Sequence, residues 1–219
     1  EWASAYIGMP VTLGSIHVQW RTLRPRLVIR DACLHKKIAG SGVACVKEAH
    51  LALDIWTALH GGTPEFSDLT LVGVNLSVLR HIDGRFSIIG LEDMPTDPHL
   101  QARVQEWLLK QDTLIIKNSQ LRWRDERSGQ ERQFIHVHLR LRNNGERHYV
   151  SGTVAMAPDP ETRIKAVLEL QGNIFGANGW SGKGYVEGAA VELGPWLAGR
   201  ALAGAELSAG AMDFKLWGT

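Results

Sequence analysis

The chain has 219 residues, of which 44% are hydrophobic and 21% are charged, and this composition excludes disordered and fibrous proteins. We expect one globular domain, or one and a part. The 24 Lys and Arg residues almost balance the 23 Asp and Glu residues, so the formal net charge is +1. Because nucleic-acid binding requires many phosphates to be neutralised, we expect no nucleic-acid partner.

The sequence contains no apolar stretch that is long enough to cross a bilayer as a helix, which takes about 18 or more residues. The chain begins at Glu1 rather than at Met. We therefore expect a processed or excised piece, from which a targeting signal can have been removed.

Strands are predicted along most of the chain, because apolar and polar residues alternate with a period of two. In the clearest case, Ile135, Val137 and Leu139 alternate with His136 and His138. The same alternation occurs in residues 51–55, 150–156 and 164–170. Strands with one apolar and one polar face are typical of an antiparallel sheet.

Two dipeptides, Asp83-Gly84 and Asn144-Gly145, lie between apolar stretches and favour the two-residue turns of β-hairpins. The simplest topology is then a meander, in which each strand pairs with the next one along the chain.

One segment has helical periodicity instead of alternation. Its apolar residues lie on a single face of a helix, and they are Leu100, Val104, Trp107 and Leu108. Asp97 supplies an N-cap and Pro98 a first-turn proline. We expect one amphipathic helix over residues 98–110, which covers one end or side of the sheet, and a weaker helical turn near 195–202.

A repeat appears when the predicted strands are aligned. The apolar residues Leu69, Leu71, Leu76 and Val78 match Leu114, Ile116, Leu121 and Trp123 at a constant offset of 45 residues. Leu27, Ile29 and Leu34 match the first three of these at an offset of 42 residues. In each copy the alternation changes parity near Asp31, Gly73 or Asn118, as an inserted bulge residue would cause. The pattern predicts strands that bend midway and build a curved sheet, with chance similarity among leucine-rich strands as the alternative.

No motif for catalysis emerges, since phosphate loops, zinc-protease helices and nucleophile elbows are all missing from the sequence. His136 and His138 offer two imidazoles to a metal, but no further ligand completes a site, and a solvated strand face is the better interpretation. Cys33 and Cys45 also lack zinc-site spacing. We expect no enzymatic activity, no catalytic residue, no metal and no cofactor.

Seven arginines lie between residues 122 and 147, at positions 122, 124, 127, 132, 140, 142 and 147. Acidic residues interrupt them, so we interpret this segment as a solvated sheet face, with anionic lipid headgroups as the alternative. Eight tryptophans occur in the chain. Trp20, Trp56 and Trp123 lie near predicted strand ends, where they suit the rim of an open apolar groove, with core anchoring as the alternative.

A set of short motifs follows in a fixed order along residues 8–193. They are Gly8-Met9-Pro10-Val11, then Trp20 and Pro25, DGRFSIIGL (83–91), WLLKQDTLIIKNSQLRWRDE (107–126), LRLRNNGERHYV (139–150) and WSGKGYVEG (180–188). In this order the set resembles the large bacterial YhdP/AsmA-like family.

The resemblance implies an amino-terminal piece of a long periplasmic protein of diderm bacteria, anchored to the inner membrane by a helix that this piece lacks. Such proteins look like repeating β-grooves that move phospholipid toward the outer membrane. The implied partners are phospholipid, the inner membrane and proteins of the envelope. The motifs of the family are structural, so no catalytic residue is carried over.

On this basis we expect residues 1–193 to form a groove module and residues 194–219 to begin a following repeat unit or linker. The predicted lipid-groove lining consists of Ile29, Leu51, Leu53, Leu71, Leu76, Ile116, Leu121, Val137 and Leu139, with Trp20, Trp56 and Trp123 at the groove rim. The alternatives are a closed sandwich core, a scaffold that assists the assembly of outer-membrane proteins without carrying lipid, and a β-rich hydrolase.

Cys33 and Cys45 are equidistant from position 39, so a hairpin about that centre places them opposite each other on one face. A disulfide is then geometrically possible, and the oxidising periplasm implied by the resemblance permits it. The alternative is a pair of inert packing cysteines, or a register that a bulge near Asp31 shifts by one.

Overall fold

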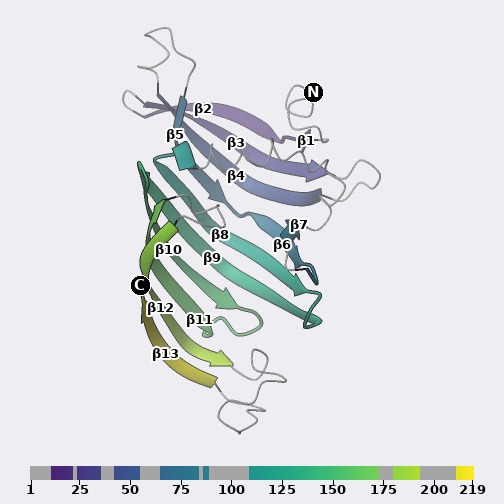
Figure 1. Ribbon diagram of the computed structural model, residues 1–219. Coiled ribbons are helices and arrows are strands. Elements are labelled where there is room, and N and C mark those ends of the chain that lie inside the picture. Colours follow the sequence, from purple (N-terminus) through teal and green to yellow (C-terminus); the bar gives the residue numbers. More distant parts are fainter. Residues whose placement is uncertain are drawn as a thin grey trace, which may run out of the picture.

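The computed structural model describes residues 11–21, 24–35, 42–54, 65–83, 86–88, 109–172, 180–192 and 211–219, and these form a single curved sheet of 13 strands (Figure 1). The strands are β1 (Val11–Thr12), β2 (Ser15–Arg21), β3 (Arg24–His35), β4 (Gly42–Asp54), β5 (Glu65–Val72), β6 (Asn75–Arg80), β7 (Phe86–Ile88), β8 (Thr113–Asp125), β9 (Gln130–Asn144), β10 (Arg147–Met156), β11 (Arg163–Gly172), β12 (Trp180–Glu192) and β13 (Ala211–Gly218). The expectation of a mainly β, mostly antiparallel and bent sheet is confirmed.

The strand order is a meander on both sides of a parallel centre. Strands β2 to β5 pair antiparallel in sequence, and so do β8 to β13. Strands β5 and β6 instead pair parallel to β8. The expected meander is therefore wrong at this point, because a parallel pair needs a crossover connection, which the chain between β7 and β8 is long enough to make.

The repeat at an offset of 45 residues is the parallel pairing itself. Leu69 and Leu71 are the Cα partners of Leu114 and Ile116, and Leu76 and Val78 are those of Leu121 and Trp123. The offset therefore records two strands that lie side by side in register, and the alternative of chance similarity is wrong for this pair.

The strands bend where the sequence changes parity. Asp31, Gly73 and Asn118 have positive φ angles of 50°, 67° and 48°, as do His136 and Ala190, both at 50°. An extra residue with positive φ behaves as a β-bulge, which turns the following side chains to the other face and bends the strand. We call these five residues the crease. Positive φ occurs at all three positions where the parity change was predicted, and a register shift accompanies it at Asn118.

One face of the sheet carries the leucines of the repeat, and we call it the apolar face. A buried cluster on this face consists of Leu69, Leu114 and Leu141, with exposed fractions of 6%, 7% and 7%. Burial of each such side chain stabilises the fold by about 1.5–3 kcal/mol. We call the opposite face, which carries Arg122, Arg124, Arg140 and Arg142, the polar face.

Both predicted hairpins are confirmed, since β6 pairs with β7 and β9 pairs with β10. In the second hairpin Asn144 is the Cα partner of Arg147, so the turn residues are Gly145, with φ at 60°, and Glu146. The glycine thus supplies the positive φ one position earlier in the turn than the Asn-Gly pattern predicted.

Of the expected helix over residues 98–110, only Leu109 and Lys110 are described, and both are helical. The rest of it, the helical turn near 195–202 and Ile55 lie outside the described residues. None of the described helical segments is long and apolar enough to span a membrane. Strand β13 pairs with β12 and continues the same sheet, and the expected division at residue 194 stays a prediction.

Candidate functional site

The apolar face extends across the full width of the sheet. Two rows of Cα partners cross ten strands, from β2 to β13, and contain only apolar residues and glycines. The first row is Val18, Leu27, Leu51, Leu69, Leu114, Leu141, Val150, Leu168, Gly184 and Gly218, and the second is Ile16, Ile29, Ala49, Leu71, Ile116, Leu139, Gly152, Ala166, Val186 and Leu216.

The predicted lining residues lie together on this face. The register places eight of them there, namely Ile29, Leu51, Leu71, Leu76, Ile116, Leu121, Val137 and Leu139. The side chain of the ninth, Leu53, lies outside the described residues. Whether any of them contacts lipid stays a prediction.

A hollow of about 450 Å³ opens on the apolar face beside the crease. Five predicted residues line it: Leu76, Ile116, Leu121, Val137 and Leu139. Five further apolar side chains in the lining were not predicted, namely Val74, Phe134, Val154, Ile164 and Ala166, and Ser119, Gln120, His138, Gly152 and Thr153 complete the lining. The alternation in 150–156 and 164–170 contained the signal for Val154, Ile164 and Ala166, while Val74 and Phe134 are displaced in parity by the crease.

The side chains around the hollow are mostly half-buried, in contrast to the leucine cluster beside it. Within the described ranges all strands belong to one sheet, and none of them forms a second layer over the apolar face. The described strands thus leave the apolar face without a second sheet layer, and the side chains around the hollow keep part of their surface exposed.

Glycines on β12 shape the far side of the apolar face. A Cβ atom at Gly184 would lie 2.6 Å from Cδ2 of Leu168, and one at Gly182 would lie 2.5 Å from the carbonyl oxygen of Glu169. A Cβ atom at Gly188 would meet the ring of Phe214. Side chains of the neighbouring strands, such as Leu168 and Phe214, therefore fill the space beside these glycines. The surface over β12 stays apolar although these three positions have no side chain.

Polar residues bound the apolar face at both ends of the strands. At one end His148, which is 3% exposed, contacts Asn143 through Nδ1 (2.7 Å to Oδ1) and donates from Nε2 to the carbonyl oxygen of Gly172 (3.2 Å). At the other end the guanidinium of Arg80 pairs with the carboxylate of Asp125 (Nη1 to Oδ2, 3.4 Å). The apolar surface is thus limited along the strands but continuous across them.

The predicted rim residues have different positions. Trp20 is 71% exposed and lies on the apolar face of β2, which is an edge strand. Trp123 is half-buried between its Cα partners Val78 and Arg132, beyond the hollow. Trp56 lies outside the described residues, and a rim function stays a prediction for all three.

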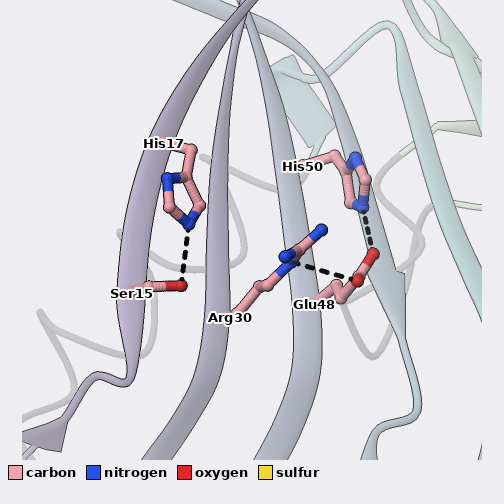
Figure 2. Close-up of polar contacts among 5 residues, drawn as sticks. All are labelled: Ser15, His17, Arg30, Glu48 and His50. Carbon is pink, nitrogen blue, oxygen red and sulfur yellow. Dashed lines mark hydrogen bonds and ion pairs between the residues drawn. The ribbon is translucent and has the colours of Figure 1, made fainter.

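The polar face carries ion pairs between neighbouring strands (Figure 2). On β4, Glu48 accepts hydrogen bonds from Nε2 of His50 (2.9 Å) and pairs with Nε of Arg30 on β3 (3.3 Å). The hydrogen bond from His50 is the main cause that lowers the pKa of Glu48, while desolvation opposes it and the charge of Arg30 adds to it. On β2, Ser15 and His17 are in contact at 3.0 Å on the same face.

The arginine-rich segment divides between the two faces. Arg122, Arg124, Arg140 and Arg142 are exposed on the polar face, so its interpretation as a solvated face is confirmed for these residues. That interpretation is wrong for Arg132, which is the Cα partner of Trp123 on the apolar face and is half-buried. The extra residue at His136 reverses the parity between Arg132 and the other arginines of β9.

Cys33 and Cys45 are Cα partners, as the hairpin about position 39 predicted, with their Cα atoms 4.2 Å apart. Their Sγ atoms are joined in a disulfide. By the register they lie on the polar face, next to the crease residue Asp31.

The two histidines of β9 are separated by the crease, since His136 has a φ of 50° and His138 pairs regularly with Thr153. Among the described residues no three His, Cys, Asp or Glu side chains are grouped closely enough to hold a metal ion.

Comparison with known proteins identifies the family of the chain. The family model described as "YhdP protein" matches residues 1–219. The chain belongs to the YhdP family. The resemblance seen in the order of the sequence motifs is thereby confirmed.

A relative with a described function is the "Intermembrane phospholipid transporter YhdP" of Escherichia coli (strain K12), which is 24% identical over 193 residues. The match covers 87% of this chain and 14% of that YhdP protein, so the chain spans a small part of its relative. The family and this relative support a connection with lipid transport in general.

Proposed function

We propose that this chain is a non-enzymatic, lipid-conducting module of a periplasmic protein that is anchored to the inner membrane and moves phospholipid between the inner and outer membranes. In this proposal the apolar face holds acyl chains and the polar face stays in water. The observation that supports it most strongly is the pair of apolar rows that cross ten strands without a polar side chain.

The free energy of the cargo explains why such a face needs to be continuous. Each methylene group exposed to water costs about 0.8 kcal/mol, so two acyl chains of roughly 16 carbons cost on the order of 25 kcal/mol when fully exposed. Any polar interruption would expose part of a chain and raise a barrier to movement. Both rows avoid this, because every position in them is an apolar residue or a glycine.

The dimensions also fit. Neighbouring strands lie about 4.8 Å apart, so a row across ten strands is roughly 40 Å long. This is about twice the length of one extended acyl chain. The hollow of about 450 Å³ lies within the range of about 300–1,000 Å³ that is usual for small-molecule sites.

The relative from Escherichia coli adds support, because its name describes phospholipid transport between membranes. The substrate and the membranes in our proposal are taken from that name. Transport by the whole protein is an activity of a much longer chain, to which this module contributes one section of the route.

Two neighbouring residues of β11 provide the test. Ala166 lines the hollow, whereas Val167 is 44% exposed on the opposite face. We expect Ala166→Asp to reduce crosslinking of a phospholipid with a photoactivatable acyl chain by about tenfold or more, because a charge on an apolar wall is poorly solvated. Val167→Asp, which also removes an apolar side chain, is expected to have no effect.

Equal crosslinking in both variants, with both folded by circular dichroism, would contradict an acyl-chain site on the apolar face. The alternative function, a scaffold for outer-membrane protein assembly, predicts no bound lipid. Mass spectrometry of the protein purified without added lipid separates the two, since co-purifying phospholipid supports the conducting module and a lipid-free protein supports the scaffold.

A further inference from the structure

Two arginines lie on the apolar face, next to the hollow. One row of Cα partners on β6, β8 and β9 that lines the hollow is Leu76, Leu121 and Phe134. The next residues on this face are the Cα partners Val78, Trp123 and Arg132, and the following row contains Arg80, Asp125 and Gln130. Successive residues on one face of a strand are about 7 Å apart, so the cationic side chains begin one step beyond the apolar hollow.

The charge balance of this cluster is positive. Asp125 pairs with Arg80 at 3.4 Å, and its Oδ1 accepts a hydrogen bond from the backbone N–H of Arg127 at 2.9 Å. Desolvation raises the pKa of Asp125, whereas hydrogen bonds from Arg127 and Ser128 and the charge of Arg80 lower it. The net shift of this pKa is downward, so the carboxylate stays ionised. Asp125 thus balances the charge of Arg80, and the charge of Arg132 is left without a carboxylate partner among the described residues.

Arg132 provides that charge. In the described residues its guanidinium donates to the carbonyl oxygen of Glu131 (3.2 Å) and to Oε1 of Gln130 (3.5 Å), and it forms no ion pair. A guanidinium has five N–H donors in a planar arrangement that suits two oxygens of a phosphate. Two of the five N–H donors of Arg132 make these hydrogen bonds, so the others can donate to a ligand on the apolar face.

We propose that Arg132, with Arg80 on the same face two strands away, binds the phosphate of a phospholipid whose acyl chains lie in the hollow. This inference rests on the proposed function and adds a headgroup site to it. A phospholipid matches the sequence of groups along this surface. Its apolar chains correspond to the hollow, and they are joined through a glycerol to a phosphate whose one negative charge corresponds to the arginines. Trp123 lies between the two regions, where an aromatic ring suits the boundary of apolar and polar groups.

The test compares two lipids that have the same photoactivatable acyl chain, phosphatidylglycerol and diacylglycerol, on the complete 219-residue chain. We expect the wild type to crosslink phosphatidylglycerol about tenfold more at equal lipid concentration, as a charge-assisted contact would cause. Arg132→Gln is expected to bring phosphatidylglycerol down to the level of diacylglycerol and to leave diacylglycerol unchanged. Arg132→Lys, which keeps the charge, should retain part of the preference.

Arg124→Gln is the matched control, because it removes the same charge from the polar face of β8, where Arg124 is exposed. The inference is wrong if the wild type crosslinks both lipids equally, or if Arg124→Gln and Arg132→Gln reduce phosphatidylglycerol equally. If the wild type crosslinks neither lipid, the proposed function fails together with the inference. If both lipids crosslink equally at residues of the hollow, the headgroup site is contradicted, whereas the proposed function is still supported.

Excess inorganic phosphate identifies the source of the ligand. If it lowers only the crosslinking of phosphatidylglycerol, the site binds phosphate without attached acyl chains. If it has no effect while Arg132→Gln still removes the preference, the site requires phosphate that is carried by a lipid. Both results support a phosphate site at Arg132.

Discussion

At the scale of single residues, the glycines of β12 determine how closely β11 and β12 pack on the apolar face. A Cβ atom at Gly182 would meet a backbone oxygen at 2.5 Å, whereas one at Gly184 would meet the end of the Leu168 side chain at 2.6 Å. Backbone cannot give way cheaply, but a leucine methyl group can. We expect Gly182→Ala to lower the free energy of unfolding by about 1–3 kcal/mol.

Gly184→Ala is the comparison for this prediction, and we expect it to cost clearly less, because Leu168 can change rotamer. Urea unfolding of the two variants measures the difference. Equal costs would show that the close approach to the Glu169 carbonyl has no energetic effect.

Glu48 gives the stability a component that depends on pH. Because its pKa is lowered in the folded protein, its contribution is fully present above the ordinary glutamate pKa and is lost as the pH falls through the lowered value. We expect Glu48→Gln to reduce the slope of stability against pH in this acidic range. Glu192→Gln, at an exposed residue outside the cluster, controls for the loss of one negative charge. An unchanged slope in Glu48→Gln would contradict the assignment.

The disulfide between Cys33 and Cys45 spans 12 residues of sequence. Replacement of both cysteines by serine is expected to lower the free energy of unfolding by about 2–3 kcal/mol, since a short loop is no longer closed in the unfolded chain. Thiol counting under denaturing, non-reducing conditions tests the bond directly. Two free thiols in protein taken from its native compartment would exclude it.

At the scale of elements, the crease is the feature that converts flat strands into a bent sheet. Asn118 is an exposed crease residue of β8 with a φ of 48°. A β-branched residue is strained in this conformation, so Asn118→Val is expected to cost on the order of 1–3 kcal/mol. Asn118→Gly should cost less than about 1 kcal/mol, because glycine adopts positive φ readily.

Gln120→Val controls for β-branching at an exposed position of the same strand that lies outside the crease, and we expect a change within about 0.5 kcal/mol. Chemical denaturation of the three variants measures these differences. A similar small change in Asn118→Val would mean that the strand can bend without the positive φ.

Elements were predictable from the sequence where the information is local. The alternation of Ile135 to Leu139 identifies a strand, because side-chain direction has a period of two. The same alternation cannot distinguish parallel from antiparallel neighbours, so the pairing of β5 with β8 was visible only as a repeat. Arg132 was misplaced for a related reason, since it has the same parity as Arg140 until the extra residue at His136 is known.

At the scale of the whole molecule, the open question is whether lipid occupies one hollow or the whole apolar face. The hollow was only partly predictable, because Phe134 and Ala166 come together through the register of β8 to β11 rather than through any sequence motif. The continuity of the rows, in contrast, follows from the alternation of apolar and polar residues within the individual strands. A conducting function needs that continuity, whereas a binding pocket needs only the hollow.

The ends of one row distinguish these two possibilities. Ile16 on β2 and Leu216 on β13 belong to the same row and are 54% and 59% exposed. With a photoreactive amino acid at either position, we expect crosslinks to phospholipid, because an exposed apolar row shelters an acyl chain along its whole length. The same probe at the adjacent residues His17 and Lys215, which lie on the polar face, should give none. Crosslinks from a probe at Leu139 but from neither end would restrict lipid to the hollow, and the module would then bind lipid without conducting it.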